Sequence, residues 1–229
     1  MSSGFQNPIT IKDAIDKIHS RQFLLPAIQR KFTWSSVQIE MLFDSILQGY
    51  PINSFMLWKI SDSNIKSGYK FYEFLTSFRE FFAENNTDID TKGVPDFEAV
   101  IDGQQRLTSL YIGLRGTYAY KMPRKWWKDT EDCLPTRRLY LNLGVPVKQQ
   151  YDNQKAFDFR FLSKSDLEKF NKAQNTSIWF EVGQILDLDS TKKVMRYLSD
   201  NNLTDNDYAY DTLSTFCLLY TSPSPRDPK

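Results

Sequence analysis

The spacing of hydrophobic residues predicts amphipathic helices that begin at residues able to cap them. One helix is predicted over residues 10–20, with Thr10 as its N-cap and Asp13 three positions later. A second begins at Ser35, which forms a capping-box pattern with Gln38, and ends at Gly49. The apolar positions of this second helix lie on one face: Ile39, Leu42, Phe43, Ile46 and Leu47.

Three further segments have helical character. Apolar residues at positions 71, 74, 75, 78, 81 and 82 favour a helix over 71–82 rather than a strand followed by a helix. KSDLEKFNKAQN, residues 164–175, is expected to be helical with Ser163 or Ser165 as its cap. The last predicted helical region covers 188–203.

The remaining hydrophobic runs are short and typical of strands. Residues 23–34 are expected to be extended, because Pro26 disfavours helical backbone at Leu25. Polar loops are expected at 61–68 and 84–96. The irregular order of helices and strands favours the α+β class over an alternating doubly wound sheet. The expected strands are 54–60, 97–101, 138–144, 157–163 and the start of 177–186.

Composition excludes several classes of protein. The chain has 229 residues, a net charge of +1 and 15% aromatic residues, which is typical of a globular protein and gives no global basic signal for nucleic acid. It has no apolar run of membrane-spanning length and no signal-peptide core, so we expect a cytoplasmic protein without a membrane partner. The sequence also contains neither a P-loop nor a Rossmann fingerprint.

Histidine and cysteine are too few for several chemistries. The two cysteines, Cys133 and Cys217, make no disulfide framework. The single histidine, His19, excludes a zinc finger or an HNH-type nuclease centre within this chain. His19 directly follows an apolar stripe, so we expect it at the surface near a helix end.

The C-terminal tail differs in composition from the rest of the chain. Three prolines lie within the last seven residues, and CLLYTSPSPRD, residues 217–227, resembles the peptide encoded by one reading frame of a common sequencing adapter. We therefore expect residues 217–229 to be adapter-derived. On this interpretation the natural sequence stops near Phe216 and continued in the gene, and the alternative is a linker that was cut short.

The stretch FEAVIDGQQRLTSLYIGL, residues 97–114, predicts a strand, a tight turn and a helix. A purely structural interpretation has Asp102 capping the helix and Gln105 completing a capping box. Leu107, Leu110, Tyr111 and Leu114 then form a core stripe. This interpretation leaves Gln104 and Arg106 unexplained.

A functional interpretation of the same turn is an anion site. The start of a helix presents free N–H groups and the positive end of the dipole, which favour phosphate. Gly103 lets a ligand approach the backbone, and Arg106 would oppose the dipole unless an anion joined them. Asp102 is a candidate ligand for a divalent metal or a residue that orients water.

A second Gln-Arg pair, Gln29 and Arg30, lies in the extended segment before the helix that Ser35 caps. Three motifs together resemble the N-terminal domain of GmrSD-type restriction endonucleases. They are P-x-x-Q-R-x-F-x-W at 26–34, the Gly-Tyr-Pro-Ile turn at 49–52 and DGQQRLTSL at 102–110. The resemblance covers about residues 5–200, and 157–186 also look like that family.

The resemblance implies a ParB/sulfiredoxin-like fold with a small mixed sheet and flanking helices, followed by an incomplete α-rich region. The nucleotide-binding domain is expected over 1–145, and its truncated continuation over 146–216. The expected cofactors are a nucleoside triphosphate and Mg²⁺. The implied catalytic residues are Asp102, Gln104, Gln105 and Arg106, with Asp102 also a metal ligand, and the cofactor-binding residues are Gly103, Gln29, Arg30 and Thr108.

A separate segment, KMPRKWWK at 121–128, interleaves basic residues with tryptophans and can bind a phosphate backbone and stack bases. The structural alternative is a loop that its tryptophans anchor to the core. The candidate nucleic-acid residues are Arg124, Lys125, Trp126, Trp127 and Lys128.

These observations and the resemblance lead to one function and one alternative. The first is an NTP-hydrolysing sensor domain of an anti-phage DNA restriction system, which acts on modified or foreign DNA and is cut before its C-terminal nuclease domain. The alternative is a non-catalytic, ParB-like DNA-binding module in which DGQQR meets the DNA backbone. A purely structural scaffold for the missing half also stays open. The expected partners are DNA and that nuclease domain, and the sequence leaves oligomer formation open.

Overall fold

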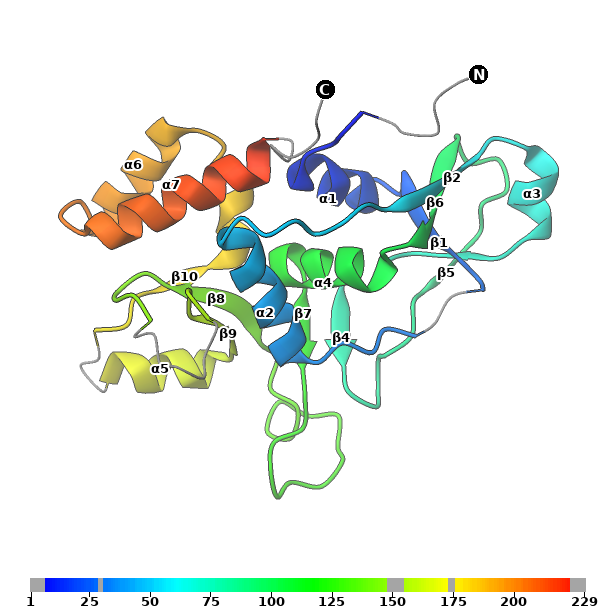
Figure 1. The fold of residues 1–229 in the computed structure, drawn as a ribbon. Helices are drawn as coiled ribbons and strands as arrows, with labels where there is room; N and C mark the ends of the chain where they lie inside the picture. Colours follow the sequence, from blue (N-terminus) through cyan, green and yellow to red (C-terminus); the bar gives the residue numbers. More distant parts are fainter. Residues whose placement is uncertain (1–6, 29–30, 148–154, 173–175, 223–229) are drawn as a thin grey trace.

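The computed structural model describes residues 7–28, 31–147, 155–172 and 176–222. Helix α4 (Gln104–Arg115) lies at the centre of the molecule, with a mixed sheet on one side and an antiparallel sheet on the other (Figure 1). Almost every residue of α4 is buried, including the predicted stripe of Leu107, Leu110, Tyr111 and Leu114. This central helix therefore links the two halves of the fold.

The mixed sheet has the strand order β2-β6-β1-β3-β5 within the described residues. Its strands are β1 (Phe23–Pro26), β2 (Met56–Ile60), β3 (Phe71–Tyr72), β5 (Asp88–Ile89) and β6 (Phe97–Asp102). Only the central pair, β1 and β6, is parallel, with Leu24 opposite Ala99. The carboxyl ends of β1 and β6 therefore reach the same edge of the sheet, and α4 begins at that edge, one residue after β6.

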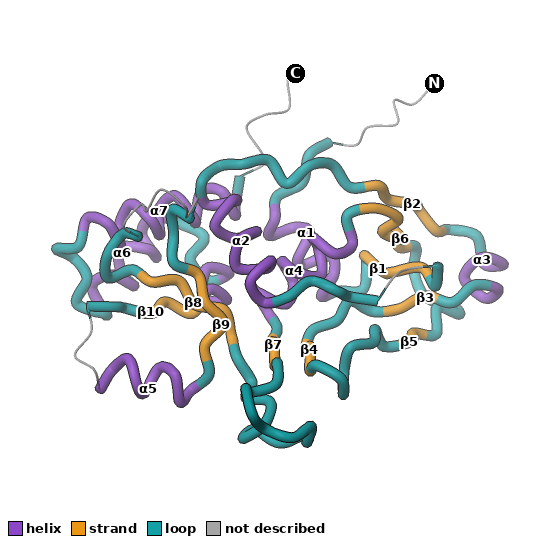
Figure 2. Tube along the Cα trace, turned by 60° about the horizontal axis from the view of Figure 1, so that its bottom comes forward, coloured by secondary structure: helices purple, strands orange, loops and turns teal. Residues whose placement is uncertain are grey.

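Two smaller sheets complete the strands. The antiparallel sheet has the order β10-β8-β9 and is built from β8 (Arg138–Asn142), β9 (Phe159–Leu162) and β10 (Trp179–Glu181). A parallel pair joins β4 (Ser77–Arg79) to β7 (Thr117–Ala119). Figure 2 shows this pair beneath α4, at the base of a long loop.

The helices α1 (Ile11–His19) and α2 (Ser36–Leu47) begin as the sequence predicts. Thr10 with Asp13 and Ser35 with Gln38 form complete capping boxes. Ser163 accepts a hydrogen bond from the Asp166 amide at the start of α5 (Lys164–Lys172), so the first of the two proposed caps is correct. His19 lies exposed at the end of α1, as expected.

Three secondary-structure predictions are wrong, and one of them is the loop expected at 84–96, which contains β5 (Asp88–Ile89). Residues 71–82 form β3, β4 and connecting turns rather than a helix, because Phe71 and Tyr72 pair with both β1 and β5. Their apolar spacing suited either structure, and tertiary pairing decided between them. The expected loop at 61–68 contains α3 (Ser63–Gly68), since Asp62 caps the Asn64 amide.

The C-terminal part packs onto the same core as the N-terminal part. A 3-10 helix, η1 (Val182–Leu186), leads to α6 (Thr191–Asp200) and α7 (Asp207–Thr221). Phe216 and Tyr220 of α7 are buried in the cluster that also contains Phe43 and Leu110. The α+β class is confirmed, whereas the ParB/sulfiredoxin-like assignment, the proposed domain boundaries and the adapter origin of residues 217–229 stay predictions.

Among the described residues, no helix combines the length and the apolar character that a bilayer crossing requires.

Candidate functional site at the start of α4

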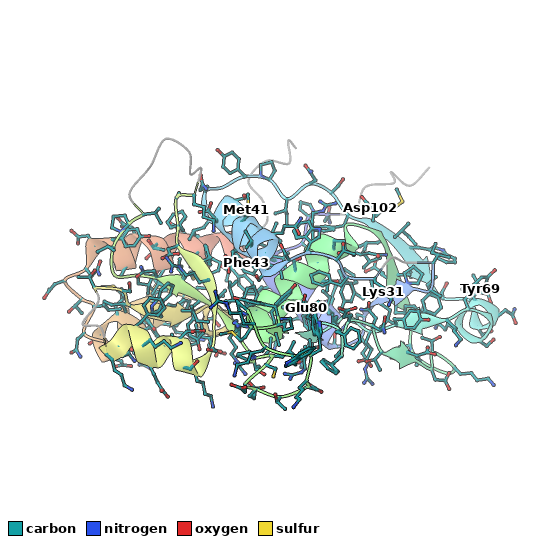
Figure 3. All side chains as sticks on the ribbon, turned by 90° about the horizontal axis from the view of Figure 1, so that it is seen from below. Lys31, Met41, Phe43, Tyr69, Glu80 and Asp102 are labelled. Atoms are coloured by element: carbon teal, nitrogen blue, oxygen red, sulfur yellow. The ribbon has the colours of Figure 1, made fainter. Side chains whose placement is uncertain are left out.

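The turn between β6 and α4 differs from the capping box that the sequence suggests. Gly103, not Asp102, is the N-cap, with φ 85° and ψ 9°, and no side chain caps the helix. The Asp102 carboxylate lies at the end of β6 with 73% of the side chain exposed (Figure 3). The prediction of an Asp102–Gln105 capping box is therefore wrong, because Gly103 adopts left-handed backbone and turns the Asp102 side chain away.

Glycine is required at position 103 for two reasons. Left-handed backbone is unfavourable for residues with a Cβ atom. A Cβ at this position would also lie 2.3 Å from Cδ1 of Phe55. The turn therefore combines a special backbone conformation with close packing, as is common where a backbone must approach a ligand.

The uncapped helix start has the geometry of an anion site. The first intrahelical hydrogen bond runs from the Leu107 amide to the Gly103 carbonyl at 3.0 Å. The N–H groups of the preceding helical residues have no acceptor within the helix. They lie at the carboxyl edge of β1 and β6, and the start of a helix favours anions.

Gln104 anchors the helix to the sheet. Its side chain is buried and its Nε2 donates to the carbonyl oxygen of Val100 in β6. The amide is therefore turned into the protein, and its role is to position the turn.

Gln105 joins the helix to the segment that follows β1. Its Oε1 accepts a hydrogen bond from the Thr33 amide at 3.0 Å, and its Nε2 donates to the Lys31 carbonyl at 3.1 Å. Gln29 and Arg30 lie outside the described residues, but the chain that carries them is held at Lys31 beside α4. Gln105 thus joins the start of α4 to Lys31 and Thr33.

Arg106 binds a third segment, the loop before β2. The guanidinium donates to the carbonyl oxygens of Ile52 and Ser54, the latter at 3.2 Å. It lies 4.9 Å from the centre of the Phe55 ring and 3.6 Å from the Asp102 carboxylate. These partners compensate for a cation in the first turn of a helix, so Arg106 has a structural role that the sequence did not indicate.

Thr108, the remaining predicted cofactor residue, and Lys31, which the sequence did not single out, differ in access. Thr108 is only 3% exposed, one residue after the first turn of α4, so its hydroxyl does not line the surface of the helix start. Lys31 is exposed on the loop that Gln105 holds (Figure 3). Asp102 and Lys31 are therefore the exposed side chains beside the turn, whereas Gly103 and Gln104 are buried.

A metal ion would have one protein carboxylate here. Within the described ranges no cluster of three His, Cys, Asp or Glu side chains has metal-binding geometry. Mg²⁺ commonly takes one or two carboxylates and fills its other positions with phosphate oxygens and water. Asp102 fits that pattern when a nucleotide supplies the phosphates.

The predicted nucleic-acid residues lie apart from the α4 turn, on the loop between β7 and β8 that extends away from the body (Figures 1 and 2). Trp126 is 85% exposed, so it does not anchor the loop to the core. Lys125 pairs with Asp132 at 2.7 Å, and this hydrogen bond raises the pKa of Lys125. Trp127 lies 5.4 Å from the ring of Phe81, a residue the sequence did not single out.

A cavity of about 210 Å³ lies near the start of β1. Polar and apolar side chains line it, and His19 Nδ1 there lies 3.2 Å from the Tyr111 hydroxyl. Arg21 pairs with Glu73 at its rim, at 2.8 Å. None of the residues of the DGQQR turn lines this cavity.

Comparison with known proteins agrees with this arrangement of motifs. The family model for the GmrSD restriction endonuclease N-terminal domain matches residues 11–220. An archaeal relative, the uncharacterized protein MJ0686 of Methanocaldococcus jannaschii, is 33% identical over 141 residues. That match covers 62% of this chain and 21% of the relative, so it spans about a fifth of the relative's length. The chain belongs to the GmrSD restriction endonuclease N-terminal domain family.

Proposed function

We propose that this chain is the nucleotide-binding and nucleotide-hydrolysing regulatory domain of a DNA restriction system that acts on modified or foreign DNA. The observation that carries the proposal is the uncapped start of α4, with Gly103 in left-handed backbone at the carboxyl edge of β1 and β6. Membership of the restriction endonuclease family supports the biological setting. A phosphate group is the ligand that such a helix start favours.

In this proposal the backbone N–H groups at the start of α4 bind the terminal phosphates. Lys31 is exposed on the adjoining loop and supplies positive charge. Asp102 would hold Mg²⁺ together with phosphate oxygens and water, and the ion neutralises phosphate charge when it is bound. A water molecule then attacks the γ-phosphorus, the bond from that phosphorus to the bridging oxygen breaks, and the water proton passes to the released phosphate.

Gln104, Gln105 and Arg106 act as positioning residues in this scheme. Each is bonded to a different backbone segment: Gln104 to β6, Gln105 to the loop after β1, and Arg106 to the loop before β2. Their replacement would therefore disturb the site by releasing a segment. Because of its contacts with Ile52 and Ser54, we expect Arg106→Ala to abolish hydrolysis and also to lower stability.

Asp102→Asn is the more discriminating variant, because the side chain is exposed and makes a single ion pair. Phosphate release should be measured on the purified chain with several nucleoside triphosphates, with and without Mg²⁺. We expect Asp102→Asn to lower Mg²⁺-dependent release at least tenfold while the melting temperature stays within about 2 °C. A release rate of Asp102→Asn equal to that of the unmodified chain would refute the role of Asp102. The absence of phosphate release from both proteins would refute hydrolysis.

A second candidate function is a non-catalytic DNA-binding module, supported by the exposed Trp126 and the basic residues of the β7–β8 loop. In that case DNA binds with no phosphate release under any condition. Repeating the phosphate assay with added DNA separates the two functions, since only the first predicts turnover.

A further inference from the structure

Four exposed aromatic side chains gather at one end of the molecule, and we name them the aromatic tip: Phe81, Phe82, Trp126 and Trp127. Trp126 is 85% exposed and Phe81 69%. The Phe81 ring lies 5.3 Å from that of Phe82 and 5.4 Å from that of Trp127. Such a concentration of exposed aromatic surface marks an interaction site rather than scattered surface residues.

The fold assembles the tip from two segments about 45 residues apart in the chain. Strands β4 and β7 pair in parallel, with Phe78 opposite Tyr118, so the segments that follow both strands leave the body at the same end. Phe81 and Phe82 follow β4, while the tryptophans lie on the loop that follows β7 (Figure 2). The sequence pattern predicted Phe81 and Phe82 as part of a helix, and the structure exposes them instead.

The backbone at the tip is strained in two places. Phe81 has φ 70° and Arg124 φ 63°, in a region that residues other than glycine rarely adopt. The Phe81 amide donates to the Glu84 carboxylate at 2.7 Å, which helps to hold this conformation. Strain of this kind concentrates at sites where it positions a side chain for binding.

The acidic groups near the tip are satisfied within the protein. Arg79 contacts both Asp129 and Glu131, and Asp132 pairs with Lys125. Despite its burial penalty, hydrogen bonds from Thr136 and the charge of Arg79 keep the pKa of Glu131 lowered.

Two cationic side chains at the tip are available to bind an anionic ligand. The side chains of Arg124 and Lys128 form no ion pair with the described part of the chain, and both are exposed. The outer surface therefore combines aromatic faces with free positive charge.

We propose that the aromatic tip is a stacking platform for unpaired bases of single-stranded DNA, with Arg124 and Lys128 on the flanking phosphates. Aromatic faces interleaved with cations are the recognition chemistry of single-stranded nucleic acid. A duplex hides its base faces, and its major groove is read by a helix or a two-stranded ribbon, whereas the tip is an irregular loop. The inference rests on the proposed restriction function, which supplies DNA as the partner.

The test is fluorescence anisotropy of a labelled oligothymidine strand and of a duplex of equal length, titrated with the full chain at several salt concentrations. Trp126→Ala should weaken single-strand binding by about 5-fold to 150-fold, the range expected for loss of one stacked base. Trp58→Ala is the matched control, because Trp58 is also an exposed tryptophan but lies on β2. The control should bind as the unmodified chain does.

Two further variants separate binding from folding. Phe81→Gly relieves the positive φ, so we expect weaker single-strand binding without a lower melting temperature. The double variant with Arg124→Ala and Lys128→Ala should make the slope of log K against log salt less negative by about 1.4. Each lost phosphate contact accounts for about 0.7 of this change, and two contacts are lost.

Equal affinity of Trp126→Ala and the unmodified chain would overturn the proposal, as would a clear preference for duplex over single strand. Dimer formation through the tip without DNA binding would also overturn it. Phosphate release without DNA should be unchanged in Trp126→Ala. Single-strand binding without phosphate release would therefore refute only the proposed hydrolysis. Phosphate release without single-strand binding would refute only the role of the aromatic tip.

Discussion

The starts of helices α2 and α4 look alike in the sequence and differ in the structure. Ser35 and Gln38 close the start of α2 with a complete capping box, so the amides of these two residues are satisfied by each other's side chains. At α4 the equivalent pair, Asp102 and Gln105, caps nothing, and Gly103 leaves the amides without a side-chain partner. A residue pattern that can cap a helix therefore identifies a helix start but does not decide whether that start is closed or open to a ligand.

The largest expected effect concerns Gly103. Gly103→Ala should lower the free energy of unfolding by about 2 to 5 kcal/mol, from left-handed strain plus the overlap with Phe55. Gly49→Ala is the matched control, because Gly49 also has a positive φ but a Cβ there meets nothing within 4 Å. Denaturant unfolding of both variants isolates the contribution of Phe55, and equal losses would mean that the close packing at Gly103 has no cost.

Arg106 gives the next largest effect. Arg106→Ala should lower the free energy of unfolding by about 1.5 to 3 kcal/mol, because the charged hydrogen bonds to Ile52 and Ser54 are lost. Arg115→Ala, at the other end of α4, breaks only a surface ion pair with Asp16 and should cost at most about 1 kcal/mol. If the two variants unfold at the same denaturant concentration, Arg106 does not hold the loop before β2.

A direct contrast between the two helix starts comes from Ser35→Ala and Gln105→Ala. Each should lower stability by about 1 kcal/mol, through a lost cap in the first and lost hydrogen bonds to Lys31 and Thr33 in the second. Only Gln105→Ala should weaken nucleotide binding, measured by calorimetry, because it releases the segment beside the α4 turn. Weaker binding in Ser35→Ala would show that the effect follows from stability alone.

The smallest expected effect on stability belongs to Asp102. Asp102→Asn should change the free energy of unfolding by less than about 0.5 kcal/mol, since the residue is exposed and its ion pair with Arg106 is weak. Without Mg²⁺ the variant should bind nucleotide more tightly than the unmodified chain, because a negative charge near the phosphates is removed. Calorimetry with and without Mg²⁺ checks this prediction. An affinity that is unchanged under both conditions would place Asp102 outside the site.

Sequence patterns predicted the parts of the fold that local chemistry determines. The caps of α1 and α2 and the buried stripe of α4 depend on residues three or four positions apart, which the sequence displays directly. The strands over 71–82 could not be read this way, because pairing of β3 with β1 and β5 overrides an ambiguous spacing.

The DGQQR turn lies between a strand and a helix, as the sequence predicted, but its side chains have other partners than expected. Gln104 and Arg106 were left over once local capping had been considered. Gln104 bonds to the Val100 carbonyl in the preceding strand, and Arg106 bonds to the Ile52 and Ser54 carbonyls, which are distant in the sequence. No local pattern records the partners of Arg106. Phe81 and Phe82 were missed for the same reason, since only the pairing of β4 with β7 brings them to the tryptophans.

The central claim is that the open start of α4, and not the capped start of α2, binds phosphate. Backbone amide chemical shifts of isotope-labelled protein, recorded during titration with a nucleoside triphosphate and Mg²⁺, test it most directly. The account predicts that the amides of Gly103, Gln104 and Gln105 shift strongly while those of Val37 and Gln38 stay unchanged. Shifts at Val37 and Gln38 that equal those at the α4 turn, or no shift at Gly103 when nucleotide binds, would contradict it.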